Sequence, residues 1–297
     1  MSFELQSYLK KRRKLVDDGL QKYLPAASGH PSQIHQAVSY SVFSGGKRLR
    51  PILLLAGYEL FRDDIQRAVP FACAVEMLHT YSLIHDDLPA MDDDDFRRGK
   101  PTTHKAFGEA TAILAGDALQ TEAFGLLARA GLESGFAPGI VLQVILELAE
   151  GAGLSGMVAG QAADMAIQGR PCSEQELELI HRQKTSALIR ASVRMGARLA
   201  EADESSLQAL SLFGERVGLA FQIADDILDA EGGKISGKAA GSDQQKAKAT
   251  YVALFGLKNS KQRAEALIAE ALQAIKDSGP RAEPLRALAR FIINRES

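Results

Sequence analysis

Two aspartate-rich runs carry the side chains of this chain that are best suited to chemistry. The first, HDDLPAMDDDDFRR at 85–98, places Asp86 and Asp87 directly behind an apolar stretch and follows them with Asp92–Asp95. Carboxylates at the C-terminal end of a helix add to the negative end of the helix macrodipole, so they are unfavourable there without a cation. The run therefore predicts bound cations.

The second run lies about 130 residues further on, in FQIADDILD at 221–229. If this segment is helical, Gln222, Asp225, Asp226 and Asp229 stand at i, i+3, i+4 and i+7 and form one polar stripe. Partly buried carboxylates so close together repel one another unless cations neutralise them. Ligation by oxygen alone suits Mg²⁺, which keeps water ligands and shares substrate phosphates.

Other metals fit the two runs less well. A calcium loop of the EF-hand kind that began at Asp86 would need glycine at its sixth position and glutamate at its twelfth. Those positions hold Met91 and Arg97. Histidines and cysteines at zinc-binding spacing are missing from the sequence, so zinc is not expected.

Basic residues stand close to both runs and in a third motif. GGKRLRP at 45–51 places Lys47 and Arg50 ahead of a proline that is suited to open a helix. Arg97 and Arg98 follow the first run, and Lys184 lies between the runs in HRQKTSALIR. Arginine forks and lysine charges beside magnesium carboxylates predict sites for diphosphates, and more than one of them.

The segments that must position these residues are predicted to be helices. Apolar residues recur at i, i+3, i+4 and i+7 along the chain, and sustained period-two alternation is absent. Segments 71–85, 140–150 and 211–228 are apolar on most faces, so we expect helices surrounded by other helices. The composition, 46% apolar and 24% charged, is that of a globular protein. We expect one all-α domain over residues 1–297.

The net charge and the cysteine content limit which partners and which cellular compartment are expected. The net charge of −2 gives no general reason to bind nucleic acid. The N-terminus lacks the pattern of a secretory signal, and the apolar runs stop short of a membrane span. The two cysteines, Cys73 and Cys172, match no metal or redox spacing and fit a reducing compartment. We therefore expect a cytoplasmic protein without a membrane span.

Segment 231–249 differs from the rest of the chain because it is rich in glycine and lysine and has little to bury. Its lysines are Lys234, Lys238, Lys246 and Lys248. An ordinary solvated connection would explain it. Because the sequence also predicts diphosphate sites, we interpret this segment as a basic lid over them.

These motifs together resemble those of the trans-isoprenyl diphosphate synthases, and most closely the bacterial farnesyl diphosphate synthases. The resemblance runs from about residue 30 to the C-terminal FIINR and rests on GGKRLRP, HTYSLIHDDLPAMDDDDFRRGKPTTH, GMVAGQAADM, KTSALIRA and GLAFQIADDILD. It implies a large antiparallel helical bundle around a deep central cavity, and a homodimer. It also implies a prenyltransferase that condenses isopentenyl diphosphate with an allylic diphosphate, dimethylallyl or geranyl, with about three Mg²⁺ per active site.

The resemblance assigns roles to individual residues. For Mg²⁺ it implies Asp86, Asp92 and Asp225, with Asp87, Asp226 and Asp229 acting through water. For the allylic diphosphate it implies Arg97, Lys184 and Lys238. For isopentenyl diphosphate it implies Gly46, Lys47, Arg50, His79 and Arg98. For the cationic allylic carbon it implies the side-chain oxygens of Thr185 and Gln222.

Product length is expected to depend on Tyr81. A helix rises about 1.5 Å per residue, so Tyr81 lies roughly 7–8 Å below Asp86, where an aromatic ring could block a growing chain. In bacterial relatives an aromatic residue at this position accompanies farnesyl products, and Ser82 beside it is small. We therefore predict farnesyl diphosphate.

Four alternatives stay open. A geranylgeranyl diphosphate synthase would share every motif. A non-catalytic subunit of a heteromeric synthase generally lacks one aspartate motif, and both are intact here. A metal phosphohydrolase of the HD type, suggested by His79 and His85-Asp86, needs more helical histidines. A terpene cyclase would have no use for the motifs that hold a second diphosphate.

Overall fold

The structure is a computed structural model that describes residues 3–24, 30–232 and 249–294, and these residues are almost entirely helical. The first half contains α1 (Leu5–Tyr23), α2 (Ser32–Val42), α3 (Leu49–Glu59), η1 (Ile65–Ala68), α4 (Val69–Asp86), β1 (Phe96–Arg97), β2 (Lys100–Pro101), α5 (Thr103–Phe107) and α6 (Glu109–Glu133). The second half contains α7 (Pro138–Ala152), α8 (Met157–Ala166), α9 (Glu174–His181), η2 (Arg182–Ser186), α10 (Ala187–Leu199), α11 (Glu204–Ala230), α13 (Tyr251–Ala274), η3 (Pro280–Ala282) and α14 (Glu283–Ile293).

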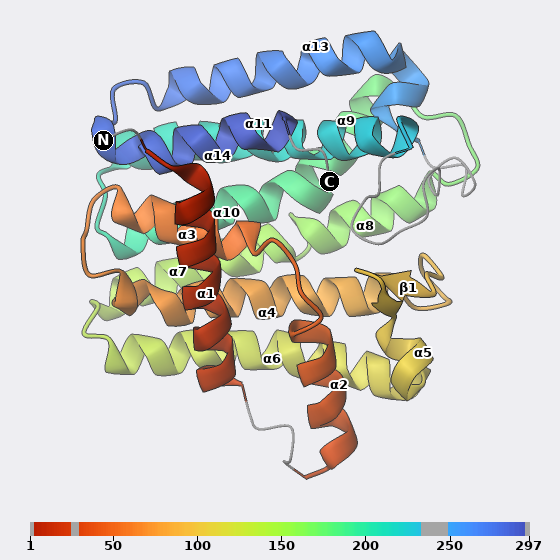
Figure 1. Cartoon of the computed structure of the whole chain (residues 1–297), viewed down its shortest axis with the longest axis horizontal. Helices are drawn as coiled ribbons and strands as arrows, with labels where there is room; N and C mark the ends of the chain where they lie inside the picture. Colours follow the sequence, from red (N-terminus) through yellow and green to blue (C-terminus); the bar gives the residue numbers. More distant parts are fainter. Residues whose placement is uncertain (1–2, 25–29, 233–248, 295–297) are drawn as a thin grey trace.

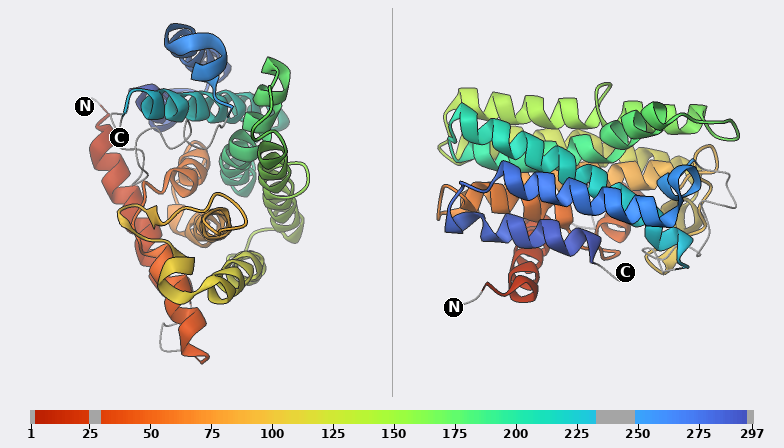
Figure 2. Two further views of the ribbon diagram at one scale, coloured as in Figure 1. Left: turned by 90° about the vertical axis from the view of Figure 1, so that its right-hand side faces the viewer. Right: turned by 90° about the horizontal axis from the view of Figure 1, so that it is seen from above.

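Helix α4 runs through the interior of the bundle. Its apolar residues occupy every face, and 13 of its 18 residues are buried against α1, α3 and α6. Seen end-on, α3 and α4 lie inside a ring formed by the other helices (Figure 2). Since a helix that is apolar all round must be covered on all sides, the sequence expectation for 71–85 is confirmed. The first aspartates therefore sit at the end of an interior helix.

The second half of the chain packs onto this interior pair through α10 and α11. Helices α3 and α10 cross at glycines: a Cβ on Gly57 would lie 2.5 Å from the Val193 carbonyl oxygen, and a Cβ on Gly196 would collide with the Leu54 carbonyl oxygen. Helix α11 in turn lies beneath α13 (Figure 1). These contacts fix α11, and with it the second aspartate run, relative to α4.

Two features differ from the sequence expectations. A two-residue hairpin, β1 with β2, interrupts the helices, and positive φ at Arg98 and Gly99 gives it the geometry of a tight primed turn. Helix α7 is not surrounded by other helices, because Leu142 and Leu146 are 67% and 56% exposed.

One stretch of the described residues, Pro138–Ala166, is long and apolar enough by length and composition to cross a membrane. The chain turns between α7 and α8 within this stretch, and α7 packs on α10. Since core helices meet the same criteria, the stretch is weak support for a span.

Candidate active site

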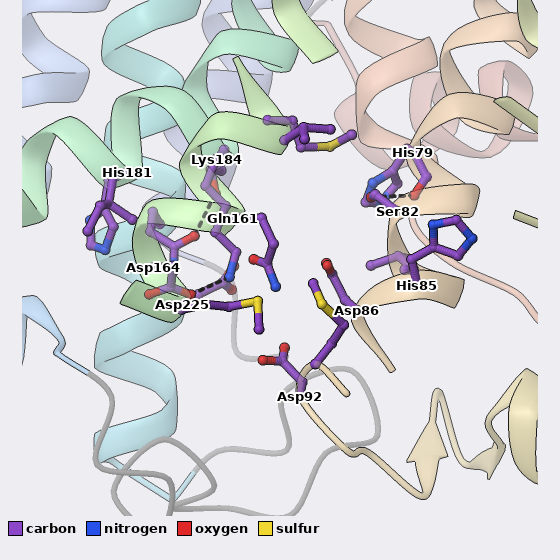
Figure 3. Close-up of a pocket in the computed structure, with 18 of the residues that line it drawn as sticks. His79, Ser82, His85, Asp86, Asp92, Gln161, Asp164, His181, Lys184 and Asp225 are labelled. Atoms are coloured by element: carbon purple, nitrogen blue, oxygen red, sulfur yellow. Dashed lines mark hydrogen bonds and ion pairs between the residues drawn. The ribbon is translucent and has the colours of Figure 1, made fainter. Parts of the chain in front are cut away.

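Both aspartate runs open into one cavity of about 610 Å³ between α4, α8, η2 and α11. Asp86 and Asp92 face Asp225 and Lys184 across it (Figure 3). Residues some 130 positions apart in the sequence thus share a single space. From the sequence-predicted set the cavity is lined by Arg50, His79, Tyr81, Asp86, Asp92, Arg97, Arg98, Lys184, Thr185, Gln222, Asp225, Asp226 and Asp229.

The loop after α4 folds back and places Asp92 beside Asp86. The Asp92 N–H donates to the Asp86 carbonyl oxygen at 2.8 Å, and the Asp94 N–H donates to that of Asp87 at 3.2 Å. Burial raises the pKa of Asp86 to about 6, Lys184 opposes this shift, and Asp92 adds to it. A carboxylate that is costly to ionise beside a second carboxylate is a group that a bound cation would stabilise.

On α11 the residues of the expected polar stripe have different contacts. Asp225 faces the cavity (Figure 3). Asp226 accepts from Gln222 Nε2 at 3.1 Å and from the Tyr251 N–H at 2.8 Å, so it also anchors the start of α13. Gln222 Oε1 accepts from Thr185 Oγ1 at 2.7 Å. These bonds fix the side-chain oxygens of Thr185 and Gln222 at the cavity wall.

The wall formed by α3, the end of α4 and the hairpin is basic. Arg50 Nη1 donates to His79 Nε2 at 3.2 Å, which leaves the proton of the neutral ring on Nδ1. Burial and the nearby arginines lower the pKa of His79 well below its ordinary value, so the ring is neutral. Burial lowers the pKa of Arg50 to about 10, and Asp225 opposes that shift. An anion would stabilise this concentration of positive charge.

Gly45 and Gly46 contact the Arg98 guanidinium and fix its position, and Asp87 fixes that of Arg97. Gly46 has φ of 123°, and a Cβ there would lie 2.6 Å from the Arg98 guanidinium, which donates to the Gly45 carbonyl oxygen. Arg97 donates to Asp87 through Nε at 2.8 Å and Nη2 at 2.5 Å. Asp87 therefore orients an arginine in the described structure.

Lys184 and Thr185 lie in η2, a single π-helical turn between α9 and α10. A π turn rotates the residues after it and is frequent at functional sites. Lys184 Nζ donates to Asp164 Oδ2 at 2.5 Å. Gly160 on α8 packs so closely against the Lys184 backbone that a Cβ would collide with it. The turn is thus fixed by α8 and directs Lys184 and Thr185 into the cavity.

Tyr81 lines the same cavity and is only 5% exposed. Its ring meets the His85 ring edge-on, with centroids 5.7 Å apart. Burial raises the pKa of its hydroxyl to about 12. That hydroxyl has no hydrogen-bond partner among the described residues, so the ring is held by packing.

Comparison with known proteins agrees with this geometry. The family model described as polyprenyl synthetase matches residues 31–285. The chain belongs to this family. It is 48% identical to a farnesyl diphosphate synthase of Geobacillus stearothermophilus, with 87% of each chain covered. It is also 43% identical to a geranylgeranyl diphosphate synthase of Cyanophora paradoxa, covering 100% of this chain and 98% of the relative.

Solved structures show the same fold. An FPP/GFPP synthase from Zymomonas mobilis superposes with a TM-score of 0.87 at 36% identity, covering 97% of this chain and 98% of the other. A geranyltransferase from Helicobacter pylori, complexed with magnesium and isoprenyl diphosphate, gives a TM-score of 0.85 at 33% identity, covering 99% and 98%. The protein is a prenyltransferase with the all-α isoprenoid synthase fold, and it elongates prenyl chains from isoprenyl diphosphate substrates.

Four residues predicted for the prenyltransferase site are not among those that line the cavity. Asp87 pairs with Arg97, as described above. Gly46 acts through Arg98, as described above. Lys47 is exposed and lines a separate groove between α1 and α14. Lys238 lies outside the described residues, as do the other lysines of the predicted lid.

Sequence reasoning gave no role to Gln161, Asp164 and His181, which also line the cavity. Gln161 is 7% exposed, and neither atom of its amide has a hydrogen-bond partner among the described residues. The i, i+3 spacing of Gln161 and Asp164 in GMVAGQAADM was the available signal. His181 gave no such signal, because only the fold brings the end of α9 to the cavity.

Proposed function

We propose that this chain is a magnesium-dependent farnesyl diphosphate synthase that condenses isopentenyl diphosphate with geranyl or dimethylallyl diphosphate. The observation that carries the proposal is that one cavity holds both facing carboxylates, with Asp86 and Asp92 opposite Asp225, and a basic wall with Arg50 and Arg98. The facing carboxylates suit a diphosphate bound with cations, and the basic wall suits a diphosphate bound directly.

Asp86, Asp92 and Asp225 fit magnesium because they offer oxygen alone, from α4, the loop after it and α11. Burial and like charge also make Asp86 costly to ionise without a cation. When bound there, Mg²⁺ would neutralise the allylic diphosphate and make it a better leaving group. Lys184 and Arg97 add fixed positive charge beside the same carboxylates.

Isopentenyl diphosphate is proposed to bind at Arg50, His79 and Arg98. His79 offers its Nδ1–H, which is buried and has no partner among the described residues. A neutral imidazole that donates one hydrogen bond positions an anion without adding charge. The exposed Lys47 would reach the same diphosphate only from outside the cavity.

The reaction breaks the C–O bond of the allylic diphosphate and forms a C–C bond to the terminal alkene carbon of isopentenyl diphosphate. The oxygens of Thr185 and Gln222 lie at the wall, where they would stabilise the developing allylic cation. Loss of one proton from the adduct then forms the new double bond. We assign that proton to the departing diphosphate.

We propose the C15 product because Tyr81 forms a buried aromatic wall below the aspartates. Geranylgeranyl diphosphate is the second candidate, because a geranylgeranyl diphosphate synthase matches over the whole chain.

We further propose that residues 1–297 are one domain and that the protein is a cytoplasmic homodimer. The exposed Leu142 and Leu146 on α7 support an association surface. Gel filtration at the 31.9 kDa mass of one chain would contradict the dimer.

The deciding experiment incubates the purified protein with Mg²⁺, isopentenyl diphosphate and geranyl diphosphate and measures the product by mass spectrometry, with and without a chelator. A C15 product that disappears with the chelator is expected. A product of C20 or longer would leave elongation in place and refute the Tyr81 wall. No condensation with geranyl diphosphate, or with dimethylallyl diphosphate in a parallel reaction, would refute the proposed synthase and favour a non-catalytic subunit.

A further inference from the structure

The four consecutive aspartates at 92–95 alternate between two sides of the loop after α4. Asp92 and Asp94 are 8% and 9% exposed; Asp92 lines the cavity, and Asp94 lies 3.7 Å from Arg97. Asp93 and Asp95 are exposed, and neither lines the cavity. Half of this acidic run therefore has no part in the site described above.

Asp93 and Asp95 meet a buried histidine. One ligand atom from each of Asp93, Asp95 and His104 lies within 4.8 Å of the other two. His104 is 6% exposed, and its Nε2 has no hydrogen-bond partner among the described residues. A buried imidazole that has an unpartnered nitrogen and lies in a cluster with two carboxylates can accept a metal ion.

Thr102 favours one tautomer of His104. Thr102 Oγ1 donates to the Asp95 carbonyl oxygen at 3.4 Å and lies 3.1 Å from His104 Nδ1. With the hydroxyl proton on the carbonyl oxygen, the tautomer of His104 that completes the second bond carries its proton on Nδ1. The proton on Nδ1 leaves a lone pair on Nε2. Metal-binding histidines are oriented in this way by a hydrogen bond from their other ring nitrogen.

The backbone holds the three ligands in place. Asp93 takes the left-handed conformation, with φ of 51°, while its N–H donates to the Leu88 carbonyl oxygen at 3.1 Å. The Thr102 N–H donates to the Asp95 carbonyl oxygen at 2.9 Å and so ties the loop to the start of α5. The arrangement therefore does not depend on exposed side chains alone.

We propose that Asp93, Asp95 and His104 form a second metal site, separate from the cavity, for a divalent transition metal ion of the Zn²⁺ class. Two carboxylate oxygens and one imidazole nitrogen favour such an ion over Mg²⁺, which prefers oxygen alone. Lys105, whose Nζ lies 2.7 Å from Asp95 Oδ1, competes for one carboxylate oxygen, and the ion uses the other or displaces the lysine. The bound ion links the loop that carries Asp92 to α5.

The test is calorimetric titration of the full chain with Zn²⁺ in excess Mg²⁺, so that the oxygen-only aspartates of the cavity are already occupied. One Zn²⁺ per chain is expected. The double variant D93N/D95N, at exposed positions, should bind at least tenfold more weakly, whereas the matched control D18N/D277N, also at exposed aspartates, should bind like the unmodified protein. Equal affinity in all three proteins would overturn the proposal.

Two further measurements separate this site from adventitious binding. Thr102→Val should weaken Zn²⁺ binding by about 10–100-fold, as loss of an orienting hydrogen bond does at other metal sites. Anomalous diffraction at the zinc absorption edge should place the ion about 2.0–2.2 Å from His104 Nε2 and from oxygens of Asp93 and Asp95. A zinc ion found only at Asp86 or Asp225 would refute the second site.

Discussion

Replacing Tyr81 with alanine should lengthen the product. The ring lies five residues before Asp86 on the interior helix α4, which places it roughly 7–8 Å below the proposed metal-binding end at about 1.5 Å per residue. Truncation to alanine removes the whole ring from the cavity wall and opens the space below it. With geranyl diphosphate as the starter, mass spectrometry should show that C20 and longer products replace C15 as the main species.

The structure also predicts how much stability this substitution loses, and it offers a control variant. Truncation of a buried aromatic residue costs about 3–5 kcal/mol of unfolding free energy, and the low end is expected here because one side of Tyr81 already borders a cavity. Tyr81→Phe keeps the ring and removes a hydroxyl that has no partner among the described residues, so both stability and the C15 product should be unchanged. A folded, active Tyr81→Ala protein that still stops at C15 would refute the Tyr81 wall.

Three other predictions follow from the site. Asp225→Asn should lower kcat roughly 10²–10³-fold with little change in thermal unfolding, and a smaller effect in steady-state assays would argue against a direct role. Burial lowers the pKa of His181 to about 4, below the unfolded value near 6.5, so unfolding free energy should fall as the pH drops from 6.5 towards 4, by up to about 3 kcal/mol. His181→Gln should flatten this pH dependence in denaturant titrations, and an unchanged slope would contradict it. Gly160→Ala should displace the Lys184 backbone and lower kcat at least tenfold, whereas Gly139→Ala, with no atom within 4 Å of the added Cβ, should behave normally.

Much of the geometry of the candidate active site could be predicted from the sequence, because its polar residues recur at helical spacing on apolar segments. Asp225, Asp226 and Asp229 share a stripe for this reason, and the structure brings Asp225 to the same cavity as Asp86. The spacing could not show that Asp226 also anchors Tyr251, because that bond joins two helices through a backbone N–H. The role of residues 231–249 stays a prediction, because it rests largely on residues outside the described part.

The transition-metal site shows a different limit. The sequence contains no histidines and cysteines at zinc-binding spacing, so it predicts no zinc site. Asp93, Asp95 and His104 come together only because the loop after α4 and the start of α5 are joined by hydrogen bonds at Thr102. In a run of four aspartates the sequence also could not show which side chains face the cavity, because the backbone of the loop decides their directions.

By itself, the sequence determined the helical fold class, the two aspartate runs, the basic motifs and the family, since each depends on residue types at short, regular spacing. Only the tertiary structure decided which of these residues meet. The crossing of α3 and α10 at glycines, the π turn against Gly160 and the fold of the loop after α4 set those distances. Their physical reason is close packing between distant segments, which spacing along one helix does not specify.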